Sequence, residues 1–169
     1  MTITDFQREN GRYFVAMQYY SLILNRTYLV LLTDSFMIGI QSNGLVSIKG
    51  GGDAFTMAVT EKLAVSGDLN NPLSYVNPNY IKRIENIDLL SDDLLTKNKS
   101  NFRISYSDIL TVKYDARKKW GMGYYPHDGK VYVKTNSGKT IEFIILGSQS
   151  GQSIRDLIAA KIPPMATVV

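Results

Sequence analysis

The sequence has no cysteine, and it has one histidine and one tryptophan in 169 residues. The lack of cysteine excludes disulfides, thiolate metal sites and a cysteine nucleophile. With His127 as the sole histidine, a zinc site would need carboxylates alone beside it, and a Ser-His-Asp triad would have to draw on a turn rich in Pro, Asp and Gly. We therefore interpret His127 as a turn residue, and we predict no metal site, no cofactor and no catalytic residue.

The sequence also lacks a long apolar segment free of charge. Residues 13–33 come nearest, with Arg26 as their single charge. Arginine near the middle of a membrane helix costs about 2.5–3.5 kcal/mol on insertion scales, and the flanking runs are aromatic and β-branched, as strands are. The first ten residues lack the basic region and apolar core of a signal peptide. We therefore expect strands at 13–33 and a cytoplasmic protein.

Composition predicts one globular domain over residues 1–169, because 44% of the residues are hydrophobic and 20% are charged. The net charge of +4 is unevenly placed. Residues 112–139 hold seven cations and two anions, which leaves the rest of the chain at −1. The positive charge is thus concentrated in one stretch.

Alternating apolar residues predict a β-hairpin at 28–44. Two apolar runs flank a polar break at Thr33, Asp34 and Ser35, as in two strands joined by a tight turn. Alternation puts the following residues on shared faces: Tyr28, Val30 and Leu32 on the first strand, and Phe36, Ile38 and Ile40 on the second. Both faces of the hairpin are largely apolar, so we expect another element to cover it.

The C-terminal part predicts four more strands and a helix. The strands are expected at 102–106, 109–115, 130–135 and 140–146. Their inward residues would be Val131 and Val133, matched by Ile141, Phe143 and Ile145. Serines followed by an apolar stripe of Ile154, Leu157, Ile158 and Ile162 predict a helix that Pro163 and Pro164 end. Such a helix should pack on the sheet or close an open barrel end.

Residues 49–100 are less regular and are predicted to form an insertion. Asp53 could cap a helix reaching about Val65, residues 66–79 are rich in turn formers, and a helix or strand is possible at about 80–90. The glycines at 50–52 lack the Gly-Lys-Ser/Thr ending of a phosphate loop, so we interpret them as a linker or tight turn. The acids Asp88, Asp92 and Asp93 do not have the spacing of a calcium loop.

Three stretches together resemble the bacterial pleckstrin-homology-like (PH-like, GRAM-like) domains. These are "LVLLTDSFMIGI", "ISYSDILTVKYD" and "GKVYVKTNSGKTIEFIIL", followed by the terminal helix. The likeness covers 28–48 and 102–162. It implies a mainly β (α+β) fold: an antiparallel bent sheet or barrel capped by a C-terminal amphipathic helix, with a helical and loop insertion at about 49–100. Proteins of this fold bind lipids or peptides or act as scaffolds, and the fold does not choose among them.

The candidate site is the basic and aromatic loop between two of the predicted strands. Its residues are Arg117, Lys118, Lys119, Trp120, Tyr124 and Tyr125. They could meet an anionic lipid headgroup or nucleic acid, or they could form a solvated loop in which Trp120 folds over the core. In eukaryotic PH domains that bind phosphoinositides the cations come from the first hairpin, whereas the turn at Thr33, Asp34 and Ser35 has none. Headgroup specificity therefore does not follow from the resemblance.

These observations favour a non-enzymatic binding or assembly module. Open strand edges and the apolar hairpin predict self-association or a protein partner. The alternative is peripheral binding of an anionic partner through residues 117–125, with a membrane surface favoured over nucleic acid. An enzyme is the weakest hypothesis, because no acid/base pair or nucleophile stands out.

Overall fold

The computed structural model describes residues 1–9, 11–21, 24–43, 71–119, 127–164 and 166–168, and it is mainly β. Its strands are β1 (Arg12–Ser21), β2 (Leu24–Leu32), β3 (Phe36–Asn43), β4 (Phe102–Ser105), β5 (Ile109–Asp115), β6 (His127–Thr135), β7 (Thr140–Leu146) and β8 (Thr167–Val168). They form one sheet in the order β4-β3-β2-β1-β7-β6-β5-β8. All neighbours are antiparallel except β5 and β8, which are parallel. The predicted fold class, a bent antiparallel sheet with a C-terminal helix, is confirmed.

The described residues also form short helices: α1 (Ile3–Arg8), η1 (Pro72–Tyr75), α3 (Pro78–Lys82), α4 (Asp93–Lys97), η2 (Tyr106–Asp108) and α5 (Gly151–Ala159). Helix α5 is the predicted terminal helix. The Ser150 side chain caps it, and it ends at Ala159, before Pro163. Helix α1 escaped the sequence analysis, although Thr2 and Asp5 form a capping box that marks its start. The helix predicted at 53–65 lies outside the described residues.

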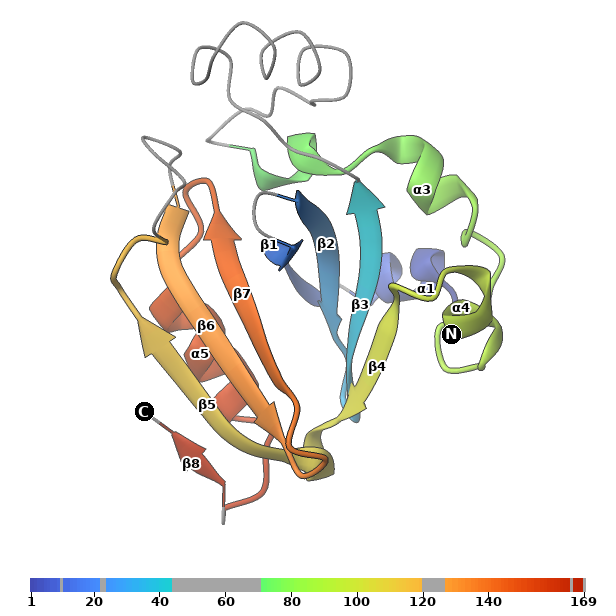
Figure 1. The fold of residues 1–169 in the computed structure, drawn as a ribbon. Helices are drawn as coiled ribbons and strands as arrows, with labels where there is room; N and C mark the ends of the chain where they lie inside the picture. Colours follow the sequence, from blue (N-terminus) through green and yellow to red (C-terminus); the bar gives the residue numbers. More distant parts are fainter. Residues whose placement is uncertain (10, 22–23, 44–70, 120–126, 165, 169) are drawn as a thin grey trace, which may run out of the picture.

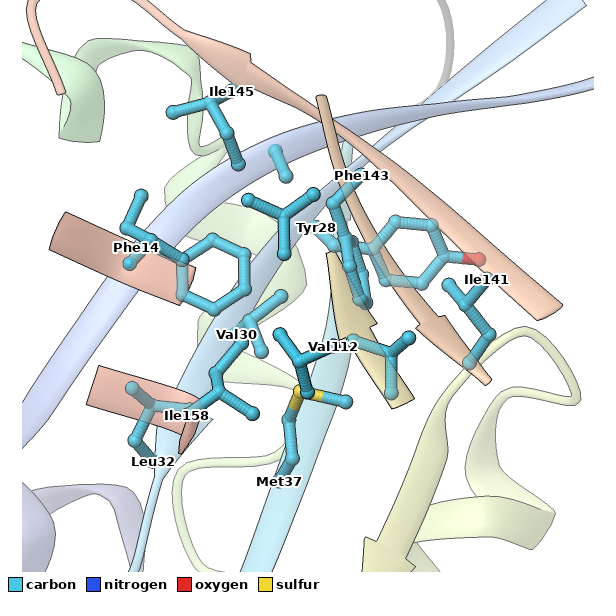
Figure 2. Close-up of a cluster of buried hydrophobic side chains, with 14 of the residues drawn as sticks. Phe14, Tyr28, Val30, Leu32, Met37, Val112, Ile141, Phe143, Ile145 and Ile158 are labelled. Atoms are coloured by element: carbon cyan, nitrogen blue, oxygen red, sulfur yellow. The ribbon is translucent and has the colours of Figure 1, made fainter. Parts of the chain in front are cut away.

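The sheet curls into a half-barrel whose concave face holds the larger core, with α5 against β5 and β6 (Figure 1). This core contains Phe14, Tyr28, Val30, Leu32, Met37, Val112, Val131, Val133, Ile141, Phe143, Ile145, Ile154 and Ile158 (Figure 2). The rings of Phe14 and Phe143 pack edge to face, with 5.5 Å between their centres. The inward faces predicted for β2, β6 and β7 are therefore confirmed.

The convex face of β1, β2 and β3 is also buried, under α1 and the segment 76–94. This second core joins Leu29, Leu31, Ile38 and Ile40 of the sheet to Ile3, Phe6, Ile84, Leu89 and Leu94. The expectation that another element covers the apolar hairpin is thus confirmed. Burial on both faces explains why these strands read as nearly continuous apolar runs.

Residues 13–33 fall almost entirely in β1 and β2, as the strand interpretation expected. In the part of the chain that the structure describes, no helix is long and apolar enough to cross a membrane. One assignment was wrong: the turn at Thr33, Asp34 and Ser35 joins β2 to β3, so it belongs to the second hairpin. The first hairpin joins β1 to β2. The tip of the first hairpin, residues 22–23, lies outside the described residues. The lack of cations in the turn at residues 33–35 is therefore no evidence about the first hairpin.

A narrow contact between β1 and β7 joins the two halves of the sheet. Two residue pairs form it, Ala16 with Ile145 and Met17 with Ile144. The side chain of Gln149, just after β7, extends this ladder. Its Oε1 accepts a hydrogen bond from the backbone N–H of Val15 at 2.8 Å, and its Nε2 donates to the backbone oxygens of Val15 and Leu146, both at 2.7 Å. Gln149 thus takes the place of a further backbone pair.

We expect Gln149→Ala to lower the free energy of unfolding by about 1–3 kcal/mol, because it leaves the buried N–H and C=O of Val15 without partners. Urea unfolding followed by circular dichroism measures the change. Gln152→Ala, on the exposed face of α5, is the control and should change stability little. Equal small losses in both variants would contradict the role of Gln149.

Candidate functional site

The described part of the predicted basic loop, residues 116–119, leaves the end of β5, and Lys119 contacts Glu142 of β7 on the convex side of the β5–β6–β7 half of the sheet. Cross-strand partners on this side are Lys113 with Tyr132, Asp115 with Lys130, and Tyr132 with Glu142. Directly opposite residues on neighbouring strands share a face. The inward residues Val112, Val131 and Val133 alternate with them, so these polar side chains all point away from the core.

We call this surface the outer basic face. It carries the cations Lys113, Arg117, Lys119, Lys130 and Lys134 and the carboxylates Asp115 and Glu142, and exposed Lys118 lies beside it in the loop. None of the described helices packs on β5 and β6 from this side, whereas α5 lies behind them (Figure 1). Five cations against two carboxylates leave an excess of three positive charges on this face.

Asp115 holds two of these cations. Its carboxylate accepts hydrogen bonds from Arg117 Nε and Nη2, both at 2.9 Å, and from the Arg117 backbone N–H at 3.0 Å. On the other side it forms an ion pair with Lys130 Nζ at 3.2 Å. These contacts, Arg117 first, hold the pKa of Asp115 well below its usual range. Lys130 is itself buried, and this carboxylate is its counter-ion.

Glu142 forms an ion pair with Lys119, another residue of the predicted site. Its Oε1 is 2.6 Å from Lys119 Nζ, and its Oε2 accepts a hydrogen bond from the Tyr132 hydroxyl at 2.8 Å. Lys119 Nζ also lies 6.0 Å from the centre of the Tyr19 ring. Burial, reinforced by the bond to Glu142, raises the pKa of Tyr132 to about 12. Tyr132 therefore stays a neutral hydrogen-bond donor at physiological pH.

The residues at the start of β6 brace the loop and the helix. His127 was wrongly interpreted as a turn residue: it is buried, and its Nε2 accepts a hydrogen bond from the backbone N–H of Lys119 at 2.9 Å. Asp128 accepts from the Tyr114 hydroxyl at 3.0 Å and from the backbone N–H of Gly151 at 2.7 Å. Asp128 thereby fixes the first turn of α5 against β5.

The structure describes three of the six residues of the predicted site. Arg117 and Lys119 are ion-paired, Lys118 is exposed, and Trp120, Tyr124 and Tyr125 lie outside the described residues. Sequence reasoning missed Lys113 and Lys134, which are exposed on the same face, and both carboxylates. The alternation that predicted Val131 and Val133 to point inward also places Lys130, Tyr132 and Lys134 outward, and this was the available signal.

No group of three or more His, Cys, Asp or Glu side chains that could hold a metal ion occurs within the described ranges. Neither a family model nor a curated protein matches the chain. Among solved structures, the C-terminal domain of an unknown protein from Leishmania infantum is similar at 11% identity and a TM-score of 0.40, covering 92% of this chain and 90% of that one. A likeness at that level assigns no role to any residue.

We expect Asp115→Asn to lower the urea midpoint at neutral pH, because it leaves Lys130 buried without its counter-ion. A carboxyl whose pKa is lowered on folding stabilises the protein above its unfolded pKa, near 3.9, and that contribution disappears as the pH falls toward the lower folded value. The gap between wild type and variant should therefore narrow below about pH 4.

Asp34→Asn is the matched control, because Asp34 forms an exposed ion pair with Lys161 at 3.3 Å. Exposed pairs contribute little, so this variant should stay close to wild type at every pH. If both variants lose the same stability, the Asp115 network does not have the importance assigned to it.

Proposed function

We propose that this chain is a non-enzymatic binding module of PH-like fold that attaches to an acidic membrane surface through the outer basic face. The observation that carries the proposal is the side of β5 and β6 on which none of the described helices packs (Figure 1), because cations predominate among its outward side chains. Lys113 and Lys134 on this face, and Lys118 beside it in the loop, are exposed and form no ion pair with Asp115 or Glu142.

The PH-like assignment is supported by the order of the strands. Seven antiparallel strands curl into a half-barrel, β1 meets β7, and an amphipathic helix after β7 packs on the concave face. The bent antiparallel sheet and the amphipathic helix that follows it are the features that the resemblance implies. The segment 71–100 adds a cover over β1, β2 and β3, as the proposed insertion would.

A membrane suits the outer basic face better than nucleic acid does. Binding of single strands relies on aromatic rings free to stack on bases. The described rings near this face already contact cations: Lys130 Nζ lies 6.0 Å from the centre of the Tyr132 ring, and Lys119 Nζ lies 6.0 Å from that of Tyr19. An acidic membrane needs only dispersed cations, each worth about 1 kcal/mol near the surface.

The test compares two triple variants that remove the same charge. Lys113→Gln, Lys118→Gln and Lys134→Gln should abolish sedimentation with vesicles of phosphatidylcholine and phosphatidylserine at low salt, because the attraction is electrostatic. Arg83→Gln, Lys97→Gln and Lys99→Gln, which lie on other elements, should leave it unchanged. Wild-type binding should fall steeply as salt rises.

If the two triple variants lose vesicle binding equally, net charge rather than this face is responsible and the proposal fails. It fails also if wild type ignores vesicles but binds single-stranded oligonucleotides, which would favour nucleic acid instead.

Self-association is a second candidate, favoured by β4, which among the described strands is the last on its side of the sheet. Its other grounds are weaker, because β8 pairs with the edge of β5 and the apolar hairpin is covered within the chain. Light scattering at low and high salt would support it through a defined oligomer that salt does not change. A monomer at both salts would rule it out.

A further inference from the structure

A second basic region surrounds a pocket of about 420 Å³ on the opposite half of the sheet. The pocket lies between the end of β3, the residues of α3 and the turn after it, and the stretch that leads from α4 to β4. Its lining residues are Ile40, Gln41, Tyr80, Arg83, Ile84, Thr96, Lys97, Asn98, Lys99 and Asn101. The volume is within the range of sites for small organic ligands.

Three of these residues are cations, Arg83, Lys97 and Lys99, and none is a carboxylate. All three are exposed, and none forms an ion pair with a described residue. This differs from the outer basic face, where Asp115 and Glu142 neutralise Arg117 and Lys119. Cations gathered around a concave site without a counter-ion concentrate the positive potential there and attract anions.

Side-chain amides hold one wall of the pocket in place. Asn101 is buried: its Oδ1 accepts from the backbone N–H of Gln41, and its Nδ2 donates to the Leu94 carbonyl, both at 2.9 Å. Asn98 Nδ2 donates to Gln41 Oε1 at 3.1 Å, and Asn98 Oδ1 accepts from the backbone N–H of Ser100 at 2.9 Å. This bonding fixes the backbone that carries Lys97 and Lys99, so a ligand would meet a preorganised wall.

The apolar part of the lining comes from Ile40, Ile84 and the ring of Tyr80. Ile40 and Ile84 are buried there, and the Arg83 guanidinium lies 5.2 Å from the centre of the Tyr80 ring. Stacking on an aromatic ring restrains an arginine while leaving its N–H groups free to bind phosphate in a fork. The site therefore offers cations for an anionic group and apolar contact for an organic body.

We propose that this pocket binds a small organic phosphate ester, of the size of a sugar phosphate or a nucleotide. Arg83, Lys97 and Lys99 would contact the phosphate oxygens, while Tyr80 and Ile40 would contact the organic part. The site is separate from the outer basic face, and it does not depend on the membrane function proposed for that face.

The experiment is calorimetric titration of the full chain with ADP and with pyrophosphate. ADP should bind more tightly than pyrophosphate, because both bring phosphates but ADP alone brings an organic body. The Arg83→Gln, Lys97→Gln and Lys99→Gln triple variant should bind ADP at least about tenfold more weakly, since each charge-assisted hydrogen bond is worth more than about 1.4 kcal/mol. Amide NMR shifts on adding ADP should cluster at residues 96–101.

The matched control is the Lys113→Gln, Lys118→Gln and Lys134→Gln variant, which should bind ADP like wild type. Equal losses in the two triple variants, or no binding by wild type, would overturn the proposal. Pyrophosphate binding as tightly as ADP would overturn the organic-ligand part. Vesicle binding lost only in the Arg83 variant would assign the pocket to a lipid headgroup and would contradict both a free ester and the outer basic face as the membrane site.

Discussion

The short ladder between β1 and β7 is the contact on which the architecture depends. It joins β1–β4 to β5–β7 through two residue pairs, and the amide of Gln149 extends it. Because the sheet continues through this point, it curls around one concave core, and α5 can pack there. The convex side of the sheet then has two regions. The one over β1, β2 and β3 is buried beneath helices, and the one over β5 and β6 carries polar side chains.

The side chains of these two convex regions differ in polarity. Over β1, β2 and β3 the outward residues are apolar, and α1 with the segment 76–94 removes them from water. Over β5 and β6 the outward residues are charged, and Asp115 and Glu142 order the cations into a network. Among the described residues that line the pocket around Asn98 and Asn101, cations occur without such carboxylates. This difference is why we assign a small-molecule ligand to the pocket and a surface partner to the strands.

Much of the fold was predictable because strands leave a local signal. The alternation in 28–40 and 130–146 gave the strands and their inward faces, and Ser150 with its apolar stripe gave α5. Other elements have little or no such signal. Helices α3 and α4 are five residues long, and β8 is two residues whose pairing with β5 depends on where α5 delivers the chain. Helix α1 did have a signal, the Thr2–Asp5 box, which was overlooked.

The sequence by itself determined the strand pattern, the terminal helix and the stretch that carries the positive charge, because each depends on residues near one another in the chain. Tertiary structure decided which cations act together. Strand register places Lys113 and Lys134 beside the loop cations, and it brings Glu142 to Lys119 and Asp115 to Lys130. The packing of the segment 80–101 also brings Arg83, Lys97 and Lys99 together around one pocket. No local sequence pattern predicts these contacts, because they depend on how distant segments pack.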